Sequence, residues 1–190
     1  MKLAKATPPL TINGWTLFAH PLFLDQLEAL VGVVEKLRKK DPSGYVQKNA
    51  TKRLAAIAKL IFKVIPQDPA RPEHRQGNTL GAEHRHWFRA KFFQQYRLFF
   101  RYHQPSKIIV YVWVNDEETK RAYDSGDDAY RVFRRMLETG HPPSDWAVLL
   151  AEAKKQSTRL QKSSAGLASH LVPASQCNDE HPIPRSTVRS

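Results

Sequence analysis

Apolar residues in the first third of the chain recur at helical spacing in two runs. The first run begins at Pro21, which suits the first turn of a helix, and ends at the turn sequence 41–44. A second run extends from Ala50 to Ile65 and ends before Pro66, with its cations largely off the apolar stripe. The spacing therefore predicts two helices that pair as a hairpin.

The periodicity changes after residues 66–81, where Pro and Gly recur so often that an irregular loop is expected. Aromatic and β-branched residues then crowd three runs, 87–93, 96–103 and 108–114. Such runs are typical of β-strands, and their short connections predict an antiparallel sheet.

The register of the first two strands decides what the sheet presents to solvent. A two-residue turn that pairs Phe93 with Tyr96 would mix cations and aromatic rings on both faces. A three-residue turn pairs Phe92 with Tyr96 instead, and gathers four cations on one face: Arg89, Lys91, Arg97 and Arg101. We predict the second register, with one apolar face for the helices and one basic face for a ligand.

Two helices are expected after the sheet. Apolar positions between Ala129 and Leu137 predict one of them, with Asp127 as a candidate cap and Gly140 as its stop. Ser144 is a candidate cap for a last helix that ends at about Leu160.

The expected fold class is α+β, with an N-terminal helical hairpin packed on a small antiparallel β-sheet and followed by C-terminal helices. One domain is expected over residues 13–160. Residues 1–12 are predicted to be a flexible N-terminus, and the polar residues 161–190 a disordered tail.

Charge narrows the class of partner. Thirty Lys and Arg against eighteen Asp and Glu give a formal net charge of +12, which favours polyanions such as nucleic acid, although a merely soluble basic protein is the alternative.

Between His84 and Val114 stand six Lys or Arg, three His, ten of the nineteen aromatic residues and no carboxylate. Cations that meet phosphates and rings that stack on bases are typical of proteins that bind single-stranded RNA. The alternative is that the rings are core and the cations a solvated face.

Cysteine and histidine usage limits the chemistry. The single cysteine, Cys177, excludes an intrachain disulfide, and without a signal peptide or membrane-spanning run we expect a cytoplasmic protein. His84 and His86 have metal-ligand spacing if they share a strand face, but only Glu83 accompanies them, so no metal is expected. They are candidates for titratable phosphate contacts instead.

Several motifs resemble the RelE and ParE toxin superfamily, and most closely its YhaV branch. The central strands carry two of them, Trp87-Phe88-Arg89-Ala90-Lys91-Phe92 and Tyr96-Arg97-Leu98-Phe99-Phe100-Arg101-Tyr102. Others follow the same order along residues 13–155: Asn13-Gly14-Trp15, Ala19-His20-Pro21, Asp128-Ala129-Tyr130 and Gly140-His141-Pro142-Pro143. The resemblance implies the toxin of a type II toxin-antitoxin pair, an endoribonuclease that cuts mRNA, in many relatives only on a translating ribosome. It also implies a PrlF-like antitoxin and promoter DNA as a partner of the toxin-antitoxin complex.

The resemblance also suggests which residues carry the chemistry. It assigns the alternating basic positions to Arg89 and Lys91, the next cation to Arg97, and a further arginine and tyrosine to Arg121 and Tyr123. Attack by the RNA 2′-hydroxyl needs a base and charge stabilisation but no cofactor. Because neighbouring cations favour the neutral form of a lysine, Lys91 is the candidate base, and Arg89 and Arg97 would stabilise the transition state. The candidates for RNA contact are Arg101, Tyr130, His84 and His86.

Two other functions stay open at this point. A ParE-like inhibitor of DNA gyrase shares the fold but has no need of the Arg and Lys set. A non-catalytic RNA-binding domain is harder to dismiss, because no carboxylate or histidine pair of the usual acid-base kind is visible.

Overall fold

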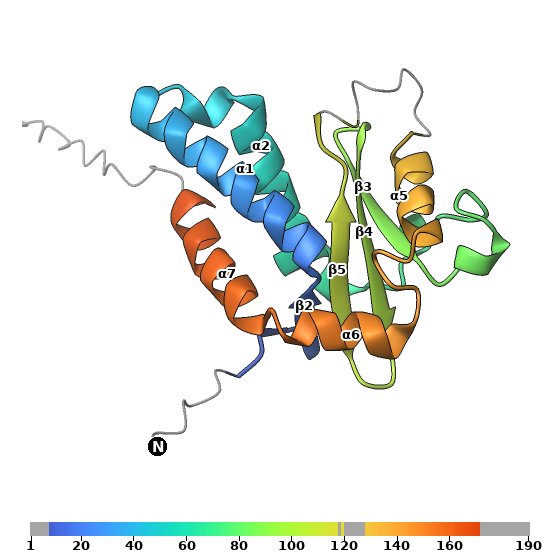
Figure 1. The fold of residues 1–190 in the computed structure, drawn as a ribbon. Helices are drawn as coiled ribbons and strands as arrows, with labels where there is room; N and C mark the ends of the chain where they lie inside the picture. The colour runs from blue at the N-terminus through green and yellow to red at the C-terminus, as the bar shows by residue number, and fades with distance from the viewer. Residues whose placement is uncertain (1–7, 118, 120–127, 172–190) are drawn as a thin grey trace, which may run out of the picture.

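The computed structural model describes residues 8–117, 119 and 128–171. Its described strands form one mixed sheet in the order β1-β2-β5-β4-β3, with helices on both faces (Figure 1). The strands are β1 (Thr11–Ile12), β2 (Trp15–Ala19), β3 (Phe88–Phe92), β4 (Tyr96–His103) and β5 (Ile108–Val114). The longer helices are α1 (Pro21–Lys40), α2 (Asn49–Lys59), α5 (Asp128–Glu138), α6 (Trp146–Lys154) and α7 (Ser157–Leu171). The α+β class is therefore confirmed.

Two strands that we did not expect precede the helical hairpin. Asn13 and Gly14 have φ values of 50° and 78°, the left-handed conformations of a tight two-residue turn, and this turn joins β1 to β2. The β2 strand then pairs in parallel with β5, so that Phe18 lies opposite Val110. The predicted purely antiparallel three-stranded sheet is wrong, because an N-terminal hairpin adds two strands at the β5 edge.

The predicted register of β3 and β4 is confirmed. Phe92 pairs with Tyr96 and Lys91 with Arg97, across a three-residue turn at residues 93–95. This register sends Ala90, Leu98 and Phe100 toward the α1 and α2 side of the sheet, where they join the larger core.

The opposite face is not an open basic surface, and in this respect the prediction is wrong. Phe99 lies on the same face as Arg97 and Arg101, and a register shift between Phe99 and Phe100 leaves Val112 unpaired in β5. At such a bulge two neighbouring side chains can share one face, and both Val112 and Trp113 are buried in the second core. That core continues with Trp87, Phe133 and Leu149, from the loop before β3, from α5 and from α6. The cations are therefore left at its margins.

The single last helix predicted to end at about Leu160 is wrong: two helices, α6 and α7, take its place, and the second extends further than predicted. Asp145, rather than Ser144, caps α6 by accepting a hydrogen bond from the Val148 amide at 2.9 Å. α7 continues to Leu171, and its Leu167 is buried in the larger core. The predicted disordered tail therefore begins too early at residue 161.

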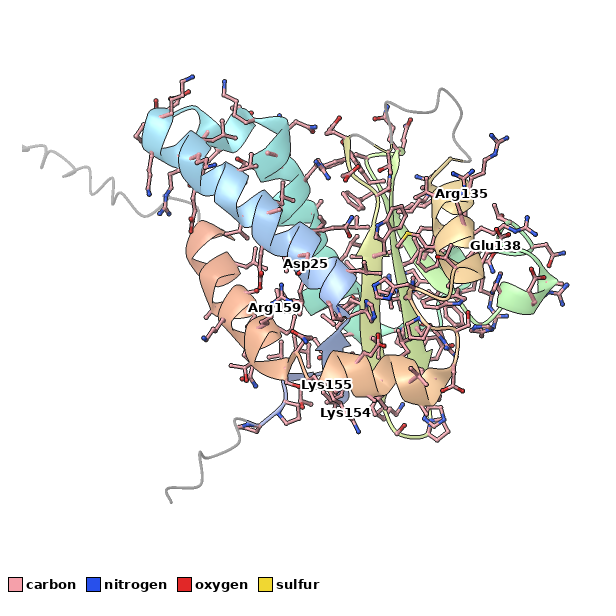
Figure 2. The ribbon with its side chains drawn as sticks, in the orientation of Figure 1. Asp25, Arg135, Glu138, Lys154, Lys155 and Arg159 are labelled. Carbon is pink, nitrogen blue, oxygen red and sulfur yellow. The ribbon has the colours of Figure 1, made fainter. Side chains whose placement is uncertain are left out.

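Charged residues also attach α7 to α1. Arg159 Nη2 lies 2.7 Å from Asp25 Oδ1 and 2.7 Å from Glu28 Oε2, and Figure 2 shows Asp25 and Arg159 facing each other from the two helices. Among the described residues, no helix has the length and apolar character needed to cross a membrane.

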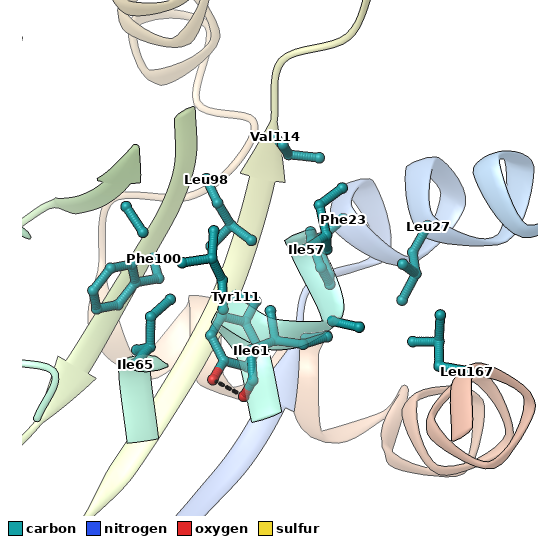
Figure 3. Close-up of a cluster of buried hydrophobic side chains, with 14 of the residues drawn as sticks. Phe23, Leu27, Ile57, Ile61, Ile65, Leu98, Phe100, Tyr111, Val114 and Leu167 are labelled. Carbon is teal, nitrogen blue, oxygen red and sulfur yellow. Dashed lines mark hydrogen bonds between the residues drawn. The ribbon is translucent and has the colours of Figure 1, made fainter. Parts of the chain in front are cut away.

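The helical layer is joined to the sheet by Tyr111 of β5, which contacts the backbone just after α2. There the helix widens into a π-helical turn, Leu60–Val64, and the Ile65 amide bonds to the Leu60 carbonyl. The Ile61 carbonyl thereby loses its usual amide partner, and Pro66 has no N–H to offer it. The buried Tyr111 hydroxyl donates to this carbonyl at 2.6 Å (Figure 3). Burial also raises the pKa of Tyr111, which keeps the hydroxyl protonated as a donor.

This contact gives a test of the fold. Replacing Tyr111 with Phe keeps the ring but leaves the Ile61 carbonyl buried without a donor, which costs about 1 to 3 kcal/mol. We expect the free energy of unfolding of Tyr111→Phe, measured by urea denaturation, to fall by this amount. Tyr102→Phe is the control, and an equal loss there would contradict the assignment.

Candidate active site

Arg89 is held in place where β3 meets the first turn of α5. Its Nε donates to the Tyr130 hydroxyl at 2.6 Å, and its Nη1 donates to the Glu73 carbonyl. Tyr130 is only 6% exposed, and its ring packs edge-on against Phe99 with centroids 5.6 Å apart. Because that ring is buried, Tyr130 fixes the guanidinium of Arg89 and does not offer a surface for a base to stack on.

Lys91 and Arg97 lie directly opposite each other on neighbouring strands. Lys91 is exposed, whereas Arg97 is 8% exposed, with its guanidinium carbon 5.9 Å from the centre of the Tyr130 ring. Arg97 Nη1 donates to the Gln94 carbonyl at 2.5 Å and to the Tyr96 carbonyl at 3.2 Å. Its buried Nε finds no acceptor among the described residues. Arg97 thus supports the turn, and its guanidinium places a positive charge opposite Lys91.

The surface around Arg89 and Lys91 is hollowed. A depression of about 270 Å³ is lined by these two residues together with Leu60, Val64, Arg71, Glu73, His74 and Ala90. Its charged wall contains three cations and a single carboxylate, so it can accept a phosphate group.

Arg101 does not belong to this cluster. It stands four residues beyond Arg97 on β4, which corresponds to about 13 Å along a strand. Its guanidinium lies between the rings of Trp87 and Trp146, 5.4 Å and 5.2 Å from their centres, and donates to the Ser144 carbonyl at 2.7 Å. Burial lowers the pKa of Arg101 to about 10, so it remains charged at neutral pH. These contacts give it a structural role that ties the sheet to the segment before α6.

His84 and His86 also depart from expectation. They precede β3 in a 3₁₀ turn (Ala82–His84) and the bend after it, closed by a hydrogen bond from the Trp87 amide to the His84 carbonyl at 3.0 Å. The predicted shared strand face is therefore wrong. Burial, with Arg101 and His84 nearby, lowers the pKa of His86 to about 4. His86 is consequently neutral at pH 7 and offers no positive charge to a phosphate.

Two predicted catalytic residues, Arg121 and Tyr123, lie outside the described residues, as does the candidate cap Asp127. Conversely, the structure places near the site several arginines that were not predicted to belong to it. Hollows next to the Arg89 region are lined by Arg71, Arg75, Arg85, Arg131 and Arg134. They were not assigned to the site because they come from the segment before β3 and from α5 rather than from the strands.

One group among the described residues has the composition of a metal site: His20, His141 and Glu152, whose donor atoms all lie within 4.8 Å of one another. His20 is fully buried, and its Nδ1 caps α1 by accepting the Leu22 amide at 3.3 Å. The proton must then sit on Nε2, which lies 2.7 Å from the Glu152 carboxylate. A metal at Nε2 would have to displace this proton, so the arrangement fits a hydrogen-bonded pair better than a metal ligand set. The signal available in the sequence was the pair of His-Pro motifs, His20-Pro21 and His141-Pro142.

The buried histidines predict acid sensitivity. Burial lowers the pKa values of His20, His74 and His86, so between pH 6.5 and about 4 the unfolded chain binds more protons than the folded one. The free energy of unfolding should therefore decrease as the pH falls through this range. Urea denaturation at several pH values should show a shallower decrease in His86→Gln. The exposed His103→Gln is the control, and an unchanged slope in the His86 variant would refute the argument.

Comparisons with known proteins agree with one another. A family model described as a toxin with endonuclease activity, of toxin-antitoxin system, matches residues 17–154. The chain is 46% identical over 149 residues to the "Ribonuclease toxin YhaV" of Escherichia coli (strain K12), an alignment that covers 77% of this chain and 97% of that protein. The "Toxin YhaV" proteins of Escherichia coli O157:H7 and O6:H1 match with the same identity and coverage. No solved structure matches.

The family match spans β2 to α6 and includes Arg89, Lys91, Arg97 and Tyr130. The chain therefore belongs to the YhaV toxin family, whose members are toxins with endonuclease activity from toxin-antitoxin systems.

Proposed function

We propose that this toxin cuts mRNA at the site formed by Arg89, Lys91 and Arg97, and that its fold and chemistry are those of the RelE and ParE superfamily. The observation that carries the proposal is the fixed guanidinium of Arg89, held by the Tyr130 hydroxyl and the Glu73 carbonyl beside the exposed amine of Lys91. A pre-oriented cation at a phosphate-sized hollow is suited to stabilising charge that develops on phosphorus.

The reaction would be an attack of the RNA's own 2′-hydroxyl on the adjacent phosphate. Lys91 would take the proton from the 2′-hydroxyl as the O2′–P bond forms. Arg89, and the positive charge of Arg97 on the neighbouring strand, would stabilise the negative charge on the phosphate oxygens. The P–O5′ bond then breaks, and the leaving oxygen takes up a proton, for which Tyr123 is our candidate donor. No step in this scheme requires a metal ion.

The partners follow from the same proposal. A toxin of a toxin-antitoxin system has an antitoxin as its partner. We infer that this antitoxin is PrlF-like, that cleavage takes place on translating ribosomes, and that the toxin-antitoxin complex binds its own promoter DNA. A formal charge of +12 is favourable for approach to ribosomal and messenger RNA.

The two alternatives have lost support. Endonuclease activity in the family does not fit a pure gyrase inhibitor or a domain that only binds RNA. Both remain outcomes of the experiment below, because growth arrest with intact mRNA would fit either of them better than a nuclease.

Arg89→Ala tests the proposal most simply. Removing one donor to the transition state lowers turnover by about 100-fold or more, so induced expression should no longer arrest growth. Mapping of mRNA 5′ ends should show the wild-type cuts disappear. Tyr130→Phe keeps the buried ring but removes the hydroxyl that holds Arg89, and we expect it to lose part of the activity.

Arg38→Ala is the matched control, because Arg38 is an exposed arginine at the end of α1, on the other side of the sheet. It should remain fully toxic. Thermal denaturation should show that all three variants are folded. Toxicity of a folded Arg89→Ala equal to that of the wild type, or growth arrest by the wild type without new mRNA ends, would refute the assignment.

A further inference from the structure

A second hollow lies next to the proposed catalytic site, on the other side of the Arg89–Tyr130 hydrogen bond. Its volume is about 430 Å³, and it is lined by Thr79, Tyr130, Arg131 and Arg134. Tyr130 links the two hollows, since it lines the second one while its hydroxyl accepts a hydrogen bond from Arg89, which lines the first. A ligand that passes Arg89 in this direction therefore meets Arg131 and Arg134 next.

The two arginines are placed to act together. They stand three residues apart on α5, a spacing that puts side chains on one face of a helix, and both are exposed. Arg134 is about half exposed, and among the described residues it forms ion pairs with Glu83 and Glu138, at 3.9 Å and 3.5 Å. Ion pairs this exposed contribute little, so a phosphate can replace them at small cost.

The next arginine on the helix provides a contrast. Arg135 is exposed on α5 but does not line the hollow, and Figure 2 shows it on α5 above Glu138. Of these three exposed arginines, Arg131 and Arg134 line the hollow and Arg135 does not. A concave surface with two guanidinium groups is suited to an extended polyanion.

We propose that Arg131 and Arg134 form a subsite for the backbone phosphates of the RNA that flank the cleaved bond. This inference rests on the proposed function, because it continues the path of an RNA strand from Arg89 across Tyr130. The subsite binds without taking part in bond breaking, and it recognises phosphate rather than base sequence. An acidic protein segment is the competing occupant, and it is less favoured because the hollow adjoins the site of the reaction.

The test measures binding of 2′-O-methyl RNA, which cannot be cleaved by 2′-hydroxyl attack. For Arg131→Ala/Arg134→Ala we expect the affinity for a long single strand to fall about tenfold or more. The slope of log affinity against log salt should decrease by about 0.7 for each lost phosphate contact. Affinity for a dinucleotide, which fills only the catalytic hollow, should not change. Arg135→Ala should leave both affinities close to those of the wild type.

Three results would overturn the subsite. They are an unchanged affinity for the long strand, an equal loss for the dinucleotide, or an equal loss in Arg135→Ala. A double variant that keeps its RNA affinity but loses binding to polyglutamate would assign the hollow to a protein partner instead. Failure of the proposed function gives a different result. If the wild type binds RNA with the expected dependence on salt and on Arg131 and Arg134 but cuts no RNA, the nuclease proposal fails and the subsite stands.

Discussion

The turn at residues 93–95 holds β3 and β4 in the register on which the candidate site depends. Phe93 and Gln94 adopt left-handed φ values of 45° and 57° without a glycine, a conformation that costs on the order of 1 kcal/mol or more per residue. Surrounding hydrogen bonds offset this cost, since Arg97 donates to the Gln94 carbonyl and Asn115 donates to the Gln95 carbonyl at 3.0 Å. A slip of one residue would exchange the two faces of the strands and separate Arg89 from Tyr130 of α5.

The second constraint is that both faces of the sheet are buried. The bulge at Val112 adds an apolar side chain to the face that carries the cations, and α5 covers it through Phe133. Charged side chains cannot lie under such a layer without partners, so they are confined to its margins. This explains why the cations on this face of β3 and β4 have two roles, ligand binding at the edge of the sheet and structural support within it. Arg89 and Lys91 reach a hollow at the β3 edge, whereas Arg101 is enclosed between two tryptophans.

Local sequence information was sufficient for much of this architecture. The helical spacing from Pro21 and the mixed faces implied by a two-residue turn identified α1 and the β3–β4 register correctly. The Asn13-Gly14 pair is a local signal for a tight hairpin, but no hairpin was predicted there. The parallel pairing of β2 with β5 depends on contacts between residues about ninety positions apart, which no local pattern encodes. The arginines of the second hollow were invisible for the same reason, because the loop and α5 meet only in the folded chain.

The proposed cleavage uses only side chains of this chain, without a metal ion, to support attack by the RNA 2′-hydroxyl. Its most direct test is the chemical identity of the ends that the purified toxin leaves on RNA in the presence of a metal chelator. The account predicts undiminished cleavage that yields a 2′,3′-cyclic phosphate on one fragment and a 5′-hydroxyl on the other. Loss of cleavage on chelation, with 3′-hydroxyl and 5′-phosphate ends when metal is restored, would contradict it and direct attention to His20, His141 and Glu152.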